Sequence, residues 1–413
     1  MANSILTPTV VTREIGVILH NNLRFCRTIN RQYDNSHKMT GQRDGGSIKI
    51  RLPNQYTTNT GAALSIQDTT ESSVTLTRAT QRHVDTNFTT DELTQSLDDF
   101  SERILKPATT TLASVIDHDA MSMTTQVGNS VGTPGTTPAT ALVWLQAGSK
   151  LSKFATPESQ RSAGLNPDAN ASTVDGLKGL FQAGDKIGSQ YKAGTMGVNT
   201  LGIDEFYMTQ NVRTHTTGSG AATSWLVDEP SSTNLVEGTR ILDMDGGSGS
   251  VTLSAGDVFT MAGVFSVNPE TKQSTGDLMQ FVVTNAATAS SGQITGGTGA
   301  GQLQFWPAIY TSSSGGLQNV DAMPADNAAV TVMGSASTQY AQNIVYHKDA
   351  FVLATADLEM PGGVDFSARE VVDDISIRLV RQYRIGTDDI PCRIDVLYGY
   401  VPYRRETACR VWG

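Results

Sequence analysis

The feature that most constrains this chain is a change of composition and charge across residues 219–340. Residues 201–340 hold three Lys or Arg against twelve Asp or Glu, a local balance of −9. Gly, Ser and Thr tracts separate five short apolar runs, GSVTL, DVFTMAGV, LMQFVVT, GQLQFWPAIY and AAVTVMG. Such spacing predicts a small antiparallel barrel or sandwich. The composition of the first half of the chain returns at Val345, so we predict that an acidic β module interrupts a continuous domain.

The beginning of the chain predicts an arm and a hairpin. Residues 1–35 are typical of an extended arm that leads into a short helix around Val11–Leu23. The segments Gly46–Tyr56 and Ser73–Phe88 then alternate apolar and polar residues, which is the period of a strand. We predict that these two segments form one long hairpin. The hairpin has little apolar content of its own, so it needs a partner surface.

A long helix is predicted next, from Thr89 nearly to Gly128. Thr89 and Glu92 fit a capping box, and apolar residues recur every three or four positions. At about 1.5 Å per residue the helix would measure about 55 Å. Pro107 should kink it near Arg103, whose carbonyl loses its hydrogen-bond partner. The segments ALVWLQAGSKLSKF and STVDGLKGLF predict two shorter amphipathic helices.

The sequence lacks the motifs of familiar enzymes and cofactor sites. It contains no G-x-S-x-G, H-E-x-x-H, Walker A or G-x-G-x-x-G pattern, and GGTGAG at 296–301 has the wrong glycine spacing and no following Lys. Asp117, His118 and Asp119 are adjacent on the predicted helix, where they point in different directions. We therefore expect no enzyme activity, no catalytic residue, no metal site and no cofactor.

The cysteines and the hydropathy add two expectations. Cys26, Cys392 and Cys409 are odd in number and widely spaced, which favours reduced thiols in a cytosol-like compartment. A run of 18 apolar residues is absent from the sequence, so no membrane span is expected.

Taken in order, these segments resemble a known family. The marks are TPTVVTREIGVILHNNLRF, GLNPDANASTVDGLKGLF with TMGVNTLGIDEFYMTQNV, LSAGDVFTMAGV, YHKDAFVLATADLEM and IRLVRQYRIGTDDIPCRIDVLYGY. They are similar to the major coat proteins of tailed bacteriophages, and most of all to the short-tailed-phage family. That family has an α+β capsid fold of the Hong Kong 97 type with an inserted antiparallel β-barrel. None of the marks is a catalytic signature, and the resemblance rests on their joint order.

The resemblance implies a division of the chain into named parts. These are an N-terminal arm (1–35), an extended loop that lies over a neighbouring subunit (36–88), a peripheral domain with a spine helix (89–140 and 369–413), an axial domain (141–218 and 341–368) and the inserted β-barrel (219–340). On this division the closing strands, with their many Arg and Tyr residues, would pair in the sheet of the peripheral domain.

The resemblance also implies partners and a place in the virion. Copies of the chain would form pentamers and hexamers of an icosahedral capsid, of T=7 type, around non-specifically bound double-stranded DNA. A scaffolding protein, a portal protein and a decoration protein would be further partners, and a procapsid assembled in the host cytoplasm would later expand.

Two groups of arginines are candidates for function. Residues 1–60 hold eight Lys or Arg against three Asp or Glu, so this part is expected to face DNA or scaffold. Arginine is also enriched where one protein buries another. The candidates facing DNA or scaffold are Arg13, Arg24, Arg27 and Arg31, and the candidates for pairing between subunits are Arg381, Arg404, Arg405 and Arg410.

Other interpretations stay open from the sequence. The basic residues of the arm are equally compatible with an ordinary solvated surface or with pairing to neighbouring subunits. A receptor-binding or tail-surface β protein is the alternative function, because the middle of the chain is rich in Gly, Ser and Thr. The long Pro-containing helix, the basic arm and the absence of repeats argue against that alternative.

Overall fold

The computed structural model describes most of the chain as two compact units. The first unit draws on residues 1–51, 73–121 and 351–403, and the second on 52–72, 122–350 and 404–413. Both units combine helices with sheets, so the fold is mixed α+β, as predicted. The described residues are 8–33, 47–62, 64, 66–67, 71–89, 106–176, 194, 196–228, 235–247 and 249–413.

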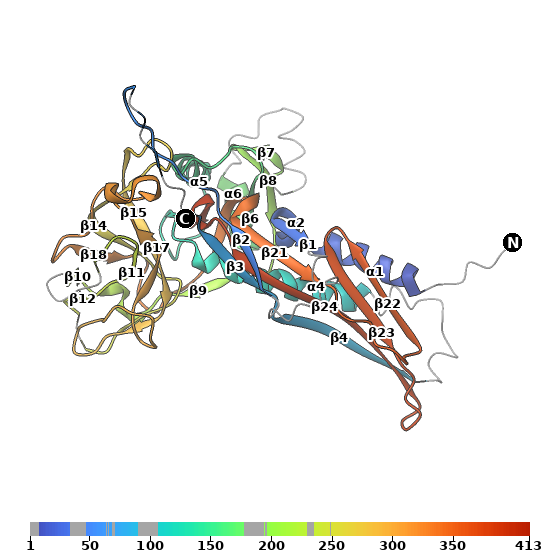
Figure 1. Cartoon of the computed structure of the whole chain (residues 1–413). Coiled ribbons are helices and arrows are strands. Elements are labelled where there is room, and N and C mark those ends of the chain that lie inside the picture. The colour runs from blue at the N-terminus through green and yellow to red at the C-terminus, as the bar shows by residue number, and fades with distance from the viewer. Residues whose placement is uncertain are drawn as a thin grey trace. The chain divides into compact units, whose positions relative to one another are not determined.

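The first unit is built on a sheet of six strands (Figure 1). The strand order is β1-β21-β24-β23-β22, and β4 also pairs with the long strand β24. Only β1 and β21 run parallel within this sheet. The bounds are β1 Asn30–Tyr33, β4 Thr80–Thr89, β21 Phe351–Ala356, β22 Phe366–Val372, β23 Ile375–Arg381 and β24 Asp389–Pro402.

Three helices pack against this sheet or one another: α1 (Pro8–Asn22), α2 (Phe25–Thr28) and α4 (Lys106–Ala120). Ile15 and Leu19 are one helical turn apart on α1 and both are fully buried. Gly16 allows α1 to approach β22, because a Cβ there would lie 2.4 Å from Cγ2 of Val372. The predicted helix near residues 11–23 is therefore confirmed, and it is held by close packing.

The acidic residues near the end of α4 serve the fold. The buried Asp117 carboxylate accepts backbone N–H groups from Arg24 (2.6 Å), Phe25 (3.3 Å) and Cys26 (3.0 Å), at the start of α2. Asp119 instead accepts the Tyr398 hydroxyl at 2.7 Å. The two carboxylates diverge, as expected for neighbours on a helix. Among the described residues no group of acidic, His or Cys side chains could hold a metal ion.

The predicted long hairpin is wrong in its pairing. Only β2 (Ser47–Arg51) and β3 (Ser73–Thr77) pair with each other. The rest of the second segment forms β4, which pairs over ten residues with β24. Alternation shows that a segment is a strand but does not say which strand it pairs with. A buried sheet supplied β4 with a partner inside the subunit.

The second unit contains a sheet with the order β5-β25-β20-β6-β8-β7. Helix α5 (Ala141–Lys153) covers it, with Trp144 and Leu151 fully buried, and α6 (Pro167–Gly176) adds Ala169. Helix α5 confirms one predicted amphipathic helix. The bounds of the strands are β5 Ser130–Val131, β6 Arg161–Leu165, β7 Val198–Thr200, β8 Ile203–Met208, β20 Asn343–His347 and β25 Ala408–Val411.

The same unit carries an antiparallel sheet of seven strands, in the order β11-β17-β15-β14-β18-β10-β12. Phe281 stacks on Phe259 at 5.6 Å and meets Phe305 edge-on at 5.3 Å, at the centre of its core. All five apolar runs contain strands. The bounds are β10 Trp225–Val227, β11 Thr239–Ile241, β12 Met244–Asp245, β14 Val258–Val267, β15 Ser274–Asn285, β17 Gln304–Ile309 and β18 Ala329–Val332.

Short elements complete this part of the chain. Strand β9 (Thr214–Thr216) pairs with β19 (Gln339–Ala341), and β13 (Thr252–Leu253) pairs with β16 (Ala287–Thr288). The 3-10 helices are η3 Met121–Gln126, η5 Ser219–Ala222, η6 Ser312–Leu317, η7 Lys348–Ala350 and η8 Arg405–Thr407.

The closing segment differs from expectation in two places. Strands β23 and β24 pair in the sheet of the first unit, as expected, but β25 lies between β5 and β20 in a sheet of the second unit. Strand β21 was expected in the axial domain and instead pairs with β24. The change from one unit to the other falls between residues 350 and 351, directly after the 3-10 helix at Lys348–Ala350.

Part of the predicted long helix is present in α4, and η3 continues it to Gln126. Pro107 lies in α4, directly after the residue at which the described part of this helix begins. The expected kink at Arg103 and the Glu92 end of the capping box lie outside the described residues. Across the part of the chain that is described, no helix is both long and apolar enough to cross a membrane.

Candidate functional site

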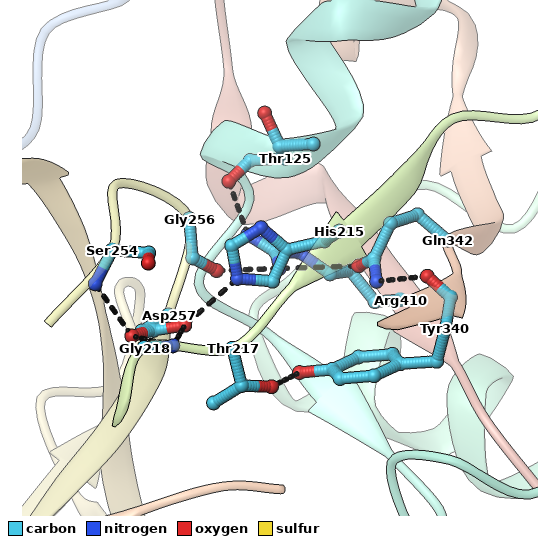
Figure 2. A network of polar contacts seen from close by, with 10 residues as sticks. All are labelled: Thr125, His215, Thr217, Gly218, Ser254, Gly256, Asp257, Tyr340, Gln342 and Arg410. Carbon is cyan, nitrogen blue, oxygen red and sulfur yellow. Dashed lines mark hydrogen bonds and ion pairs between the residues drawn. The ribbon is translucent and has the colours of Figure 1, made fainter. Parts of the chain in front are cut away.

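The second unit contains a buried polar cluster centred on Arg410 (Figure 2). Arg410 lies on β25 and its side chain is 0% exposed. Its Nη1 donates to the Gly256 carbonyl at 2.8 Å and to Gln342 Oε1 at 3.1 Å. Its Nη2 donates to the carbonyl of Thr125, in η3. One guanidinium therefore joins three segments that are far apart in the sequence.

Burial sets the charge state of this guanidinium. Desolvation lowers the pKa of Arg410 to about 10, while Tyr340 and Asp257 act in the opposite direction. The side chain therefore stays protonated at neutral pH. Because its direct partners are carbonyl and amide oxygens, Arg410 acts as a hydrogen-bond donor that holds backbone in place.

Asp257 connects the cluster to the seven-stranded sheet. This carboxylate is 0% exposed and directly precedes β14. Its Oδ1 lies 2.8 Å from Nε2 of His215, and its Oδ2 accepts the N–H of Ser254 at 2.7 Å and of Gly218 at 3.1 Å. The contacts described for His215 are this carboxylate and the ring of Tyr340, neither of which is a nucleophile that a hydrolytic triad needs.

Two further features fix the cluster's geometry. Gly256 has φ +104°, and a Cβ there would lie 2.9 Å from Cε1 of His215, so a larger residue would be strained on both counts. The ring of Tyr340 meets His215 edge-on at 6.0 Å and Trp412 edge-on at 5.5 Å. The Thr217 hydroxyl donates to the Tyr340 oxygen at 3.1 Å, and burial raises the pKa of Tyr340.

Two more sets of bonds attach the seven-stranded sheet to the rest of the unit. The Gln280 side chain on β15 accepts the Ser130 N–H at 2.8 Å and donates to the Ser130 carbonyl at 3.1 Å. Lys153, at the end of α5, pairs with Asp277 at 2.5 Å, and Asn268 donates to the Lys153 carbonyl at 3.0 Å. Chemically these contacts can position a subunit's parts, and they supply no reactive group.

A comparison with protein families decides what kind of protein this is. The family model described as "P22 coat protein - gene protein 5" matches residues 2–410. The chain belongs to the P22 coat protein family. It is therefore a bacteriophage coat protein, a structural component of the capsid. No curated protein matches the chain significantly.

Several solved capsid structures are similar to this coat protein at low identity. A Mycobacterium phage Che8 chain is 13% identical, with 94% of this chain and 90% of that chain covered and a TM-score of 0.44. A capsid chain of Ralstonia phage GP4 is 7% identical, with 93% and 86% covered and a TM-score of 0.43. The CUS-3 coat protein I-domain is 29% identical over 28% of this chain and 98% of its own, with a TM-score of 0.19.

The arginines expected to face DNA or scaffold have different environments. Arg13 on α1 and Arg24 before α2 are exposed, whereas Arg27 and Arg31 are partly buried. Nη1 of Arg31 pairs with the Asp373 carboxylate at 2.5 Å and donates to the Asp373 carbonyl at 3.0 Å. Arg31 therefore has an anionic partner within its own subunit, and its contact with DNA or scaffold stays a prediction.

The arginines expected to pair between subunits also differ in their environments. Arg410 is a correction, since its buried guanidinium is bound entirely inside the coat protein. Arg404 pairs with Glu406 of the same chain at 3.0 Å. Arg381 lies over the ring of Phe366 at 5.1 Å, and Arg405 lies over the ring of Trp306 at 5.3 Å.

Sequence reasoning missed the cluster itself. His215 and Asp257 are 42 residues apart, and neither stands in a motif. The usable signal was Arg410 within ACRVW, a charge flanked by apolar residues at alternating positions of a strand. Because the side chains of such a strand point alternately to two faces that are both covered, a charge there indicates a buried hydrogen-bonding role.

Proposed function

We propose that copies of this coat protein form the pentamers and hexamers of an icosahedral capsid, of T=7 type, that encloses double-stranded DNA. The observation that carries the proposal is the family match, which runs through residues 2–410. Assembly would proceed in the host cytoplasm with a scaffolding protein and a portal protein, and the precursor shell would expand later. Decoration proteins are possible further partners.

Exposed apolar residues between β2 and β3 support this function. Leu64 is 88% exposed, Ile66 is 82% exposed and Tyr56 is 56% exposed. Within this loop, Oε1 of Gln67 accepts the Thr57 N–H at 3.0 Å and Nε2 of Gln67 donates to the Thr57 carbonyl at 2.5 Å. Exposed apolar side chains favour burial against another protein. We propose that the loop lies over a neighbouring subunit.

The domain assignment is also part of the proposal. The arm (1–35) and the inserted β-barrel (219–340) keep their predicted bounds, whereas the pairing of β4 with β24 favours moving residues 80–88 from the extended loop (36–88) to the peripheral domain. The strand pairing favours moving β21 to the peripheral domain and β25 to the axial domain. The arm's exposed Arg13 and Arg24 remain candidates for contact with DNA or scaffold.

Particle formation is the direct test of the proposal. The full chain, produced together with a scaffolding protein, should sediment as particles of megadalton mass that electron microscopy shows to be closed shells. Recovery of small oligomers alone, under conditions in which the subunit is folded by circular dichroism, would contradict the proposal. A folded small oligomer is also what the alternative, a receptor-binding or tail-surface protein, would give.

A further inference from the structure

Arg405 has an unusual environment for a charged side chain. It lies in η8, is partly buried, and places its guanidinium 5.3 Å from the centre of the Trp306 ring on β17. Within the described part of the chain, no hydrogen-bond acceptor or carboxylate contacts this guanidinium. A cation over an indole face is attracted to it, and the fork of N–H donors stays available at the edge.

A second arginine lies close by. Arg240 is exposed on β11, the outermost strand next to β17. The register Thr239↔Ile309 and Ile241↔Gln304 places Arg240 beside the stretch of β17 that carries Trp306. Among the described residues, Arg240 also has no acceptor.

The charge balance at this place is positive. Burial, followed by repulsion from Arg240, lowers the pKa of Arg405 to about 10, and Glu406 acts in the opposite direction. The Glu406 carboxylate is already paired with Arg404 at 3.0 Å. The two guanidiniums therefore repel each other, which raises the free energy of the isolated subunit.

We propose that Arg240 and Arg405, with Trp306 as a platform, bind a carboxylate side chain of a second copy of this chain. The inference rests on the proposed function, in which copies pack against one another in a shell. A carboxylate is the fitting partner because the N–H donors of a guanidinium form bidentate hydrogen bonds with its two oxygens. The coat protein offers many, since it has 40 Asp and Glu and a net charge of −10.

Shell stability compared with subunit stability tests the proposal. Arg405→Gln, Arg240→Gln and the double variant are assembled, and the rate of subunit release from empty shells in denaturant is measured. Each single variant should release subunits about tenfold faster, which corresponds to one charge-assisted contact. The double variant should be hardly worse than the single variants, because both arginines serve one carboxylate. Arg404→Lys, which keeps a cation for the Glu406 carboxylate, is the matched control and should leave the release rate unchanged.

Thermal unfolding of the free subunit separates this role from a structural one. Both Gln variants should unfold at the same temperature as the original subunit or higher, since repulsion is removed. Arg405→Lys keeps the positive charge but loses the planar set of guanidinium N–H donors. Shells of this variant should therefore also release subunits faster than shells of the original protein. Parallel loss of stability in free subunits and shells would show that Arg405 only supports the fold. An effect confined to DNA-filled shells would assign the anion to phosphate and overturn the proposal.

A probe of the free subunit keeps the inference testable apart from assembly. Citrate, compared with chloride at equal ionic strength, should raise the unfolding temperature of the original subunit more than that of the double variant. Equal shifts in the two proteins would overturn the two-arginine carboxylate site, even if shells form normally.

Discussion

Arg410 is a buried charged side chain that donates hydrogen bonds to backbone carbonyl oxygens. Its side chain is 0% exposed, and its acceptors are the Gly256 and Thr125 carbonyls and the Gln342 amide. Such a group holds otherwise unpaired backbone oxygens and is costly to remove, because buried acceptors without donors lose several kcal/mol in all. Arg404, which directly precedes η8 in the same closing segment, is paired near the surface and should matter far less.

We predict that Arg410→Met lowers the free energy of unfolding of the free subunit by about 2–4 kcal/mol. Urea unfolding followed by circular dichroism measures this loss. Arg404→Gln is the control, with an expected loss below about 1 kcal/mol. A loss for Arg410→Met that is no larger than the control's would contradict the role assigned to the cluster.

Asp389 predicts an acid dependence of stability. Hydrogen bonds from Arg384 and Thr387 lower its pKa from 3.8 to about 2. Because the folded-state pKa is lowered, this stabilisation is present above pH 3.8 and is lost as the pH falls toward 2. Asp389→Asn should therefore flatten the stability profile in that window. Arg384→Gln should move the Asp389 titration, followed by NMR, back toward higher pH, and an unmoved titration would contradict the assignment.

At the scale of elements, the sequence predicts individual helices and strands better than it predicts which strands pair. The helices at 8–22 and 141–153 and the strands of the five apolar runs follow from period and apolarity, since their own residues decide them. The strand that pairs with β4 could not be predicted from the sequence. Ten residues that alternate between apolar and polar fit any sheet with one covered face. The polar cluster did not follow either, since its members come together only after the strands pair.

The pairing of β4 predicts two classes of amide exchange in the free subunit. Residues 80–89 are hydrogen-bonded to β24 within the chain, so their amides should exchange slowly. Residues 47–51 and 73–77 form a two-stranded pair that packs on the subunit through the buried Leu76, so their amides should exchange faster than those of β4 and slow down in shells. Hydrogen-exchange mass spectrometry checks this, and equal protection of the two regions in the free subunit would contradict it.

The contact between α1 and β22 predicts a specific rescue. Gly16→Ala should destabilise the subunit by about 1–3 kcal/mol, because the new Cβ would overlap the Val372 side chain. Adding Val372→Ala to Gly16→Ala should recover part of the loss by making room. Thermal or urea unfolding of the single and double variants measures the coupling, and purely additive losses would show that α1 is not packed in this way.

At the scale of the whole molecule, the seven-stranded sheet has its own core and yet shares polar bonds with its surroundings. We predict that a fragment of residues 212–342 gives a better dispersed amide NMR spectrum than a fragment of residues 219–340. The longer fragment retains the β9–β19 pair and the His215 and Gly218 partners of the buried Asp257, and the shorter one leaves that carboxylate with the Ser254 N–H. Spectra of equal quality would show that the cluster adds nothing to this part's folding.

The position of β25 has a consequence for the timing of synthesis. This strand is translated after every other strand of its sheet, yet it lies inside the sheet between β5 and β20 and carries Arg410. A nascent chain that has not reached residue 411 cannot close this sheet or fill the polar cluster. Chains cut short by ribosome stalling would lack both, so we expect incomplete products to be excluded from the growing shell.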